Sequence, residues 1–148
     1  MNGVVERHIA VLLNTAHAFF YAANFTEETR RKLWAEAVNY AEDVRNSMAT
    51  TGSRISANEL FFGKKPSFLK NLVEFGRIGY VTRRDIKIKG KLMEHAIKCV
   101  KVGYTHNHTG DTYRMYNPGT KRIILSHDLT WGDWNRTDPR KNMDIFVT

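Results

Sequence analysis

Residues 112–126 read TYRMYNPGTKRIILS, and this stretch decides the fold class. Polar and apolar side chains alternate over residues 112–116, which is the pattern of a half-buried strand. The turn signal NPGT follows at 117–120, because proline fixes one backbone angle and glycine accepts conformations that other residues avoid. Residues 121–126 then return as a second strand. A β-hairpin is therefore the first element that the sequence predicts.

Further short strands are predicted on both sides of this hairpin. Residues 78–81 are apolar and bounded by charge, and residues 98–104 alternate with an interruption. Residues 128–131 form a last short strand. Four or five short strands within about 60 residues are typical of a small barrel or a curled sheet. The C-terminal part of the chain is therefore predicted to be a small β-barrel.

The N-terminal part carries helical periodicity instead. Apolar side chains recur at steps of three and four along residues 5–20 and again along residues 33–48. Asn2 and Thr26 are the expected N-caps. Two amphipathic helices bury little by themselves, so they need another surface to cover them. We expect Leu12, Phe19, Phe20 and Trp34 to be exposed unless the helices dock on the barrel or self-associate.

The expected fold class is α+β, with an N-terminal helical pair followed by a small barrel. Residues 49–53 (ATTGS) have the composition of a linker, and Pro66 prevents a helix from continuing through that point. The barrel is the unit expected to fold by itself. We divide the chain into helices at 1–50, a linker at 51–67, a barrel at 68–134 and a tail at 135–148.

Net charge is distributed unevenly along the chain. The formal charge is +8 overall, yet residues 1–60 hold 6 basic and 7 acidic side chains, a net of −1. The remaining 17 basic and 8 acidic side chains give residues 61–148 a net charge of +9. A basic domain of this size is suited to binding a polyanion, and a charged surface that only confers solubility is the alternative. No apolar run approaches the roughly 20 residues of a membrane span, so no membrane partner is expected.

The basic side chains gather between residues 77 and 101, where Asp85 and Glu94 are the only acidic residues. In an extended arm Lys87 and Lys89 would lie on one face, since side chains alternate along a strand. Such a row follows DNA phosphates without reading base sequence, whereas a solvated loop is the alternative. The candidate DNA-binding residues are Arg77, Arg83, Arg84, Lys87, Lys89, Lys91, Lys98 and Lys101.

Aromatic and metal-ligating side chains were weighed in the same region. Aromatic side chains on short strands fill a barrel core more often than they stack on bases, and Trp134 is the better candidate for exposure. A zinc site needs about four ligands at fixed spacing, so His106, His108 and Cys99 are poor evidence for one. The aromatic side chains concerned are Tyr80, Tyr104, Tyr113, Tyr116 and Trp131.

Several segments, taken in order, resemble the integrase region of copia-type retrotransposon polyproteins. The resemblance spans roughly residues 2–131, and each motif alone is weak. It implies that the helices are the end of a ribonuclease-H-like integrase core and that the strands form the retroviral polymerase SH3-like domain. The segments are NGVVER (2–7), WAEAV (34–38), ELFFGKKP (59–66), FG (75–76), KCVKVGY (98–104) and YRMYNP (113–118).

The resemblance also implies a role for Glu6. In the family this glutamate completes an Asp-Asp-Glu triad that holds two magnesium ions for phosphoryl transfer. The strands that would carry both aspartates, and the zinc-binding domain before them, have no counterpart in these residues. We therefore expect no enzyme activity and no cofactor in this chain alone, with Mg²⁺ implied only for an intact integrase. The alternative for Glu6 is an exposed first-turn residue that suits the helix dipole.

Together these expectations describe a catalytically incomplete fragment related to DNA integration. It would bind DNA non-specifically through its basic SH3-like domain, and the resemblance implies a nuclear location. The first alternative is a protein-interaction module that self-associates or docks on the rest of an integrase. The second is a decayed transposon remnant without a selected function.

Overall fold

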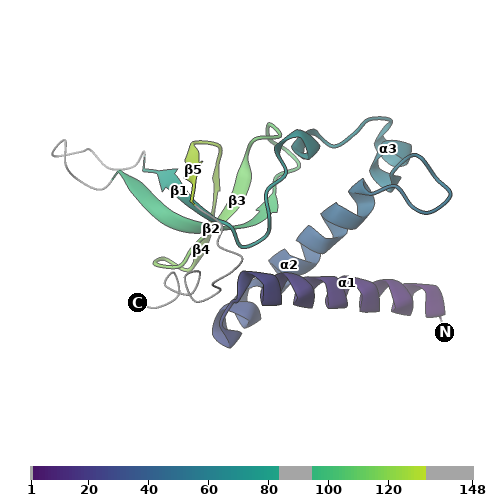
Figure 1. Cartoon of the computed structure of the whole chain (residues 1–148), viewed down its shortest axis with the longest axis horizontal. Coiled ribbons are helices and arrows are strands. Elements are labelled where there is room, and N and C mark those ends of the chain that lie inside the picture. Colours follow the sequence, from purple (N-terminus) through teal and green to yellow (C-terminus); the bar gives the residue numbers. More distant parts are fainter. Residues whose placement is uncertain (1, 84–94, 133–148) are drawn as a thin grey trace.

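The computed structural model describes residues 2–83 and 95–132 and places two long helices beside an antiparallel sheet (Figure 1). The predicted α+β class is confirmed, and the predicted strands lie within two residues of the observed ones. The elements are α1 (Gly3–Ala23), α2 (Glu27–Ser47), α3 (Ala57–Phe62), the 3₁₀ helix η1 (Ser67–Asn71), β1 (Ile78–Thr82), β2 (Ala96–Tyr104), β3 (Tyr113–Asn117), β4 (Arg122–Ser126) and β5 (Leu129–Trp131).

Local sequence signals account for the helix ends. The Thr26 hydroxyl accepts a hydrogen bond from the Thr29 N–H at 3.3 Å, so the predicted cap of α2 is confirmed. Asn2 stands at the start of α1, but its side chain makes no capping hydrogen bond. Ser56 and Glu59 form a capping box at the start of α3, where each side chain bonds the backbone N–H of the other.

The sheet has five strands in the order β4-β3-β2-β1-β5, and all neighbours are antiparallel. The predicted hairpin is confirmed, with Tyr113 opposite Ser126 and Asn117 opposite Arg122. The Asn117 side-chain oxygen accepts a hydrogen bond from the Gly119 N–H at 2.9 Å, which fixes the turn. The turn chemistry of the sequence therefore sets the register of this pair.

The sheet curls but does not close, so the predicted barrel is an open SH3-like sheet. β5 is three residues long and pairs with β1, and within the described ranges no strand pairs with the outer edge of β4. Only His127 and Asp128 separate these two edge strands in the sequence, a span of at most about 10 Å. The Thr82 N–H donates to the Asp128 carbonyl at 3.0 Å. The two edges therefore meet at one corner without forming a ladder.

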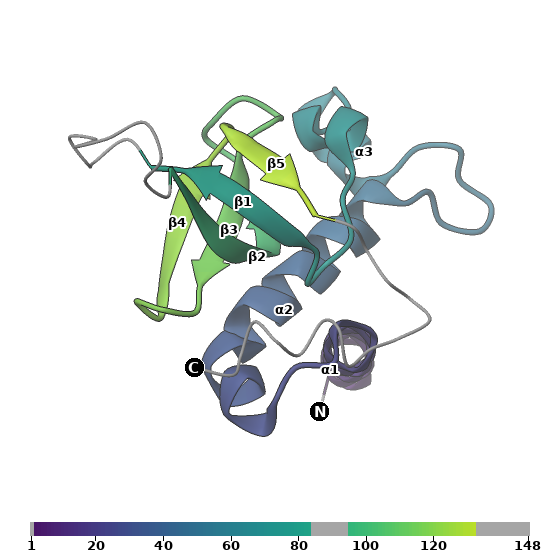
Figure 2. The ribbon, with the colours of Figure 1, turned by 60° about the vertical axis from the view of Figure 1, so that its left-hand side comes forward.

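The helical pair docks on the sheet and shares its hydrophobic core. α2 lies across one face of the sheet, and α1 packs beside α2 (Figure 2). Phe75, between η1 and β1, lies at the centre of this packing. Its ring centroid is 5.4–6.0 Å from those of four other aromatic rings. Those rings belong to Phe19, Phe20, Phe25 and Tyr40.

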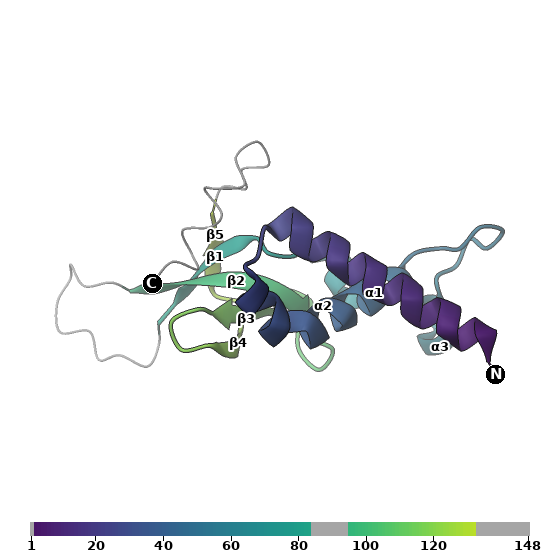
Figure 3. The same ribbon diagram turned by 90° about the horizontal axis from the view of Figure 1, so that it is seen from below.

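Docking on the sheet buries some of the helical side chains that were expected to be exposed in its absence. Leu12 and Phe20 are buried and Phe19 is half-buried, whereas Trp34 remains 60% exposed. The N-terminal half of α1 extends past the sheet (Figure 3), and the apolar side chains along it are largely exposed. No helix in residues 2–83 and 95–132 combines the length and apolar character that crossing a bilayer requires. The part of α1 near Phe20 thus completes the core, and the first turns do not.

A glycine substitution tests whether helices and sheet fold as one unit. Gly76 has φ +82°, and an added Cβ would overlap the Cβ of Ala23 at the end of α1. We expect Gly76→Ala to lower the free energy of unfolding by about 1–3 kcal/mol more than Gly52→Ala does, because overpacking adds to backbone strain. Gly52 has φ +88° with open space around it, so it isolates the backbone cost. Equal losses in urea unfolding followed by circular dichroism would show that α1 does not press on this turn.

Candidate functional site

Lys101 lies in the middle of β2 and is completely buried, with 0% exposure. Its ammonium donates a hydrogen bond to the Val73 carbonyl at 2.7 Å. The nitrogen also lies 3.9 Å from the ring centroid of Tyr40 and 3.6 Å from that of Tyr104. This geometry corrects one sequence-based assignment. Val100 and Val102 on the other face of the strand are also fully buried, so Lys101 cannot contact DNA phosphates and the candidate DNA surface no longer includes it.

The Val73 carbonyl is the acceptor on which three donors converge. The hydroxyls of Tyr40 and Tyr104 each donate to it at 3.1 Å, in addition to the Lys101 ammonium. The Tyr104 hydroxyl also accepts from the Val73 N–H at 3.1 Å. The cluster therefore joins α2, the segment after η1 and β2 through the backbone N–H and carbonyl of one residue, which would be costly to bury unpaired.

Burial sets the protonation behaviour of this cluster. Loss of water contact lowers the pKa of Lys101 well below its ordinary value, although the carboxylates of Asp43 and Glu74 oppose that change. The same loss of water contact raises the pKa of the Tyr40 and Tyr104 hydroxyls. The cluster is therefore suited to hold the layers together rather than to exchange protons with solvent.

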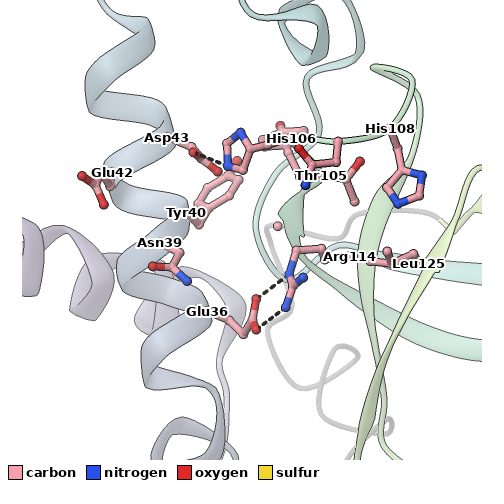
Figure 4. A pocket seen from close by; sticks show the side chains of 13 residues that line it. Glu36, Asn39, Tyr40, Glu42, Asp43, Thr105, His106, His108, Arg114 and Leu125 are labelled. Atoms are coloured by element: carbon pink, nitrogen blue, oxygen red, sulfur yellow. Dashed lines mark hydrogen bonds and ion pairs between the residues drawn. The ribbon is translucent and has the colours of Figure 1, made fainter. Parts of the chain in front are cut away.

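A groove of about 470 Å³ runs between α2 and the β2–β3 side of the sheet (Figure 4). Two carboxylates on α2 face two basic side chains across it. Arg114 donates to both oxygens of Glu36, at 2.9 and 2.7 Å, and this hydrogen bonding raises the pKa of Arg114. His106 Nε2 lies 3.1 Å from Asp43. Burial raises the pKa of Asp43, and the nearby His106 opposes that change.

These pairs give the groove a structural role. Arg114 and His106 each contact a carboxylate of α2, so these two pairs connect the walls of the groove. His108 lines the same groove, whereas Cys99 is buried in β2, where burial raises the pKa of its thiol to about 11. Within residues 2–83 and 95–132, no three His, Cys, Asp or Glu side chains gather as metal ligands.

Glu6 lies on the first turn of α1 and is exposed. Two-metal catalysis needs several carboxylates around the ions, and no such group includes Glu6 in the part of the chain that the structure describes. The residues present thus do not fit the magnesium site that the resemblance implies for an intact integrase. The local arrangement matches a glutamate that interacts favourably with the helix dipole.

Two members of the predicted basic set flank β1, with Arg77 just before its first residue and Arg83 just after its last. Arg77 is half-buried, forms a 3.5 Å ion pair with Glu74 and lies over the Trp131 ring at 5.7 Å. The Arg83 N–H donates to the His95 carbonyl at 2.7 Å, so the residues on either side of the segment 84–94 lie next to each other. Arg84, Lys87, Lys89 and Lys91 lie outside the described residues.

The outer face of the sheet carries Lys98 beside an exposed tyrosine. Tyr80 on β1 is opposite Lys98 on β2 and opposite Thr130 on β5, and its side chain is 42% exposed. Core packing, the interpretation favoured for all the strand aromatic residues, holds for Tyr104, Tyr113 and Tyr116, which are buried. Trp131 is half-buried, and Trp134 lies outside the described residues.

Sequence reasoning missed the buried cluster and one exposed group. The spacing of Tyr40 from Leu33 and Ala37 places it on the buried face of α2, so its burial was readable, but its partner Val73 is far away in the sequence. Leu60, Phe61 and Phe62 lie on the short helix α3, and the structure exposes all three. Three consecutive large apolar residues before a Gly-Lys-Lys sequence were the available signal.

Comparison with known proteins gives one family match, which lies over the strand region. A family model described as the retroviral polymerase SH3-like domain matches residues 78–144. That range begins at β1 and contains all five strands. No curated protein and no solved structure gives a significant match. The match supports assignment of this chain to a retroelement polyprotein.

Removing the buried ammonium should change how stability depends on pH. The pKa of Lys101 is lowered in the folded chain, so the unfolded chain binds more protons and folding becomes more favourable as pH rises toward the ordinary lysine value of 10.5. Relative to Lys101→Met, the natural chain should gain up to about 1.4 kcal/mol per pH unit in its free energy of unfolding. Urea unfolding at several pH values between 7 and about 9.5, below tyrosine ionisation, measures this difference. Parallel curves would show that Lys101 keeps its ordinary pKa.

Proposed function

We propose that this chain is a DNA-binding part of a copia-type retrotransposon integrase and that it contacts phosphates without reading base sequence. One coincidence carries the proposal. The stretch that matches the retroviral polymerase SH3-like family, residues 78–144, holds 13 basic and 7 acidic side chains, whereas residues 1–60 carry a net charge of −1. Positive charge thus gathers on the matched unit, as binding to a polyanion requires.

The ends of β1 and β2 supply a fixed base for the basic residues. Arg83 and His95 are joined by a backbone hydrogen bond at the point where the segment 84–94 begins and ends. That segment contains Arg84 and three lysines in its sequence. Lys98 and the exposed Tyr80 lie next to this point on the outer face of the sheet. The segment that carries these cationic residues is therefore attached to a regularly paired part of the sheet.

The proposal includes catalytic incompleteness. Glu6 is the one residue that matches the family triad, and it stands exposed on α1 without carboxylates gathered around it in the described part of the chain. A single carboxylate cannot hold two magnesium ions, so these 148 residues would contribute DNA contacts to integration rather than the chemistry.

A protein-interaction module is the second candidate, and the exposed half of α1 favours it. Val4, Val5, Ile9 and Leu13 are largely exposed along the turns that extend past the sheet. An apolar stripe of this kind favours self-association or docking on the rest of an integrase core. Sedimentation that shows a strict monomer at high protein concentration would count against self-association.

Charge reversal in the segment after β1 should remove binding to duplex DNA. The triple variant Lys87→Glu, Lys89→Glu, Lys91→Glu should bind a random-sequence duplex at least about 100-fold more weakly in fluorescence anisotropy. Each lost phosphate contact reduces the number of counterions that binding releases from the DNA. The natural chain should also weaken by a few decades between about 50 and 200 mM salt.

A charge-matched control separates a local surface from net charge. Arg7→Glu, Arg31→Glu and Arg45→Glu together change three exposed basic residues on the helices by the same total charge. This control should keep most of the affinity. If both triples bind alike, the DNA contacts are not concentrated near β1 and β2, and unchanged binding in the lysine triple would rule out the proposed surface.

Catalytic incompleteness is tested by adding the missing part of the core. The chain alone with Mg²⁺ should not nick supercoiled plasmid above background. If Glu6 keeps its family role, mixing with a fragment that carries both family aspartates should restore nicking, and Glu6→Gln should abolish the restored activity. Nicking by the unmixed chain that Glu6→Gln abolishes would contradict catalytic incompleteness.

A further inference from the structure

The turn of helix α3 presents three consecutive apolar side chains to solvent. Leu60 is 81% exposed, Phe61 82% and Phe62 65%, and α3 contains no buried residue. The capping box of Ser56 and Glu59 fixes the start of this helix, and its end is fixed by Gly63 in the left-handed conformation. The exposure is therefore imposed by an ordered turn.

Unpaired positive charge surrounds these side chains. Residues 54–70 hold four basic side chains and one acidic one, and that acid, Glu59, is bonded in the capping box. Within residues 2–83 and 95–132, none of the four basic groups forms an ion pair. By contrast, Arg31, Lys32 and Arg114 elsewhere in the fold each have a carboxylate within hydrogen-bond distance. The four are Arg54, Lys64, Lys65 and Lys70.

The two phenyl rings stabilise each other's orientation. Their centroids are 4.8 Å apart in an edge-to-face arrangement, and the high exposure of Phe61 leaves ring surface open to solvent. Lys64 and Lys65 follow within three residues of these rings. Open aromatic faces next to cations match the chemistry of unpaired bases joined by phosphates, since a base face stacks on a ring and a phosphate attracts an ammonium.

We propose that Leu60, Phe61, Phe62, Lys64 and Lys65 form an aromatic–basic tip that binds single-stranded nucleic acid. The inference rests on the proposed function, because that function makes nucleic acid the ligand of the chain, and it adds a second contact for a different form of that ligand. Base faces are hidden in a duplex, so the tip favours strands whose bases are unstacked.

The charges beside the tip also indicate the path of the strand. A groove of about 570 Å³ separates Phe62, Lys64 and Lys65 from the end of α2, where Glu42 and Asp43 form the opposite wall. Those carboxylates would repel phosphates inside the groove. The strand is therefore expected to cross the outer face of the tip, over Phe61, rather than to enter the groove.

Binding of labelled oligothymidine to the full chain tests the proposal, because this probe forms no duplex. Phe61→Ala combined with Phe62→Ala should weaken oligothymidine binding about tenfold or more and leave duplex binding unchanged. Tyr21→Ala removes another exposed aromatic side chain, on α1, and should change neither. Lys64→Glu with Lys65→Glu should weaken oligothymidine binding and reduce its dependence on salt.

The outcomes separate this proposal from the duplex surface. If the triple variant at Lys87, Lys89 and Lys91 loses duplex binding but keeps oligothymidine binding, the tip is an independent contact, as proposed. If the natural chain binds oligothymidine and the double phenylalanine variant binds it equally well, the tip is not the site. No oligothymidine binding by the natural chain also overturns the proposal. If the double phenylalanine variant loses binding only to vesicles of anionic lipid, the tip is a membrane contact and the proposal is also overturned. Unchanged helical circular dichroism is expected in the variants, since α3 buries none of its side chains.

Discussion

The structure depends on one ammonium group that has been taken out of water. Lys101 replaces its hydration with the Val73 carbonyl and the faces of two tyrosine rings, and the carboxylates of Asp43 and Glu74 act on it from a distance. A buried amine without such partners would be strongly unfavourable. Because the partners come from α2, from the segment before β1 and from β2, the buried amino group has its hydrogen-bond and ring contacts only when all three are assembled. This requirement links the helices to the sheet more specifically than apolar contact does.

The helices and the sheet share one hydrophobic core. Phe75 packs against rings from both helices, while its neighbour Gly76 donates its N–H to the Lys101 carbonyl on β2. The short segment from Val73 to Arg77 therefore serves both layers. The two helices bury little surface by themselves, and in this arrangement they cover one face of the open sheet.

Local patterns predicted the elements, and contacts distant in sequence escaped them. The NPGT turn and the alternation around it fixed the hairpin, and Thr26 fixed the start of α2, because these signals act within a few residues. Burial of Lys101 could not be predicted, since β2 is buried on both faces from Cys99 onward, so alternation marks no exposed side there, and the acceptor lies 28 residues away. The open edge likewise depends on β5 pairing with β1, which no local pattern specifies. For the candidate site, sequence located the basic region but not which of its lysines points inward.

The hydrogen bond between Arg83 and His95 has an evolutionary consequence. It pairs the backbone at the point where the segment 84–94 begins and ends. The entropy cost of closing a flexible segment between two fixed ends grows slowly with its length, by about 0.6 kcal/mol for each doubling. If the chain binds DNA as proposed, evolution could therefore change its DNA affinity at this position at a small cost in stability. The two properties would then be inherited as separate, independently adjustable traits.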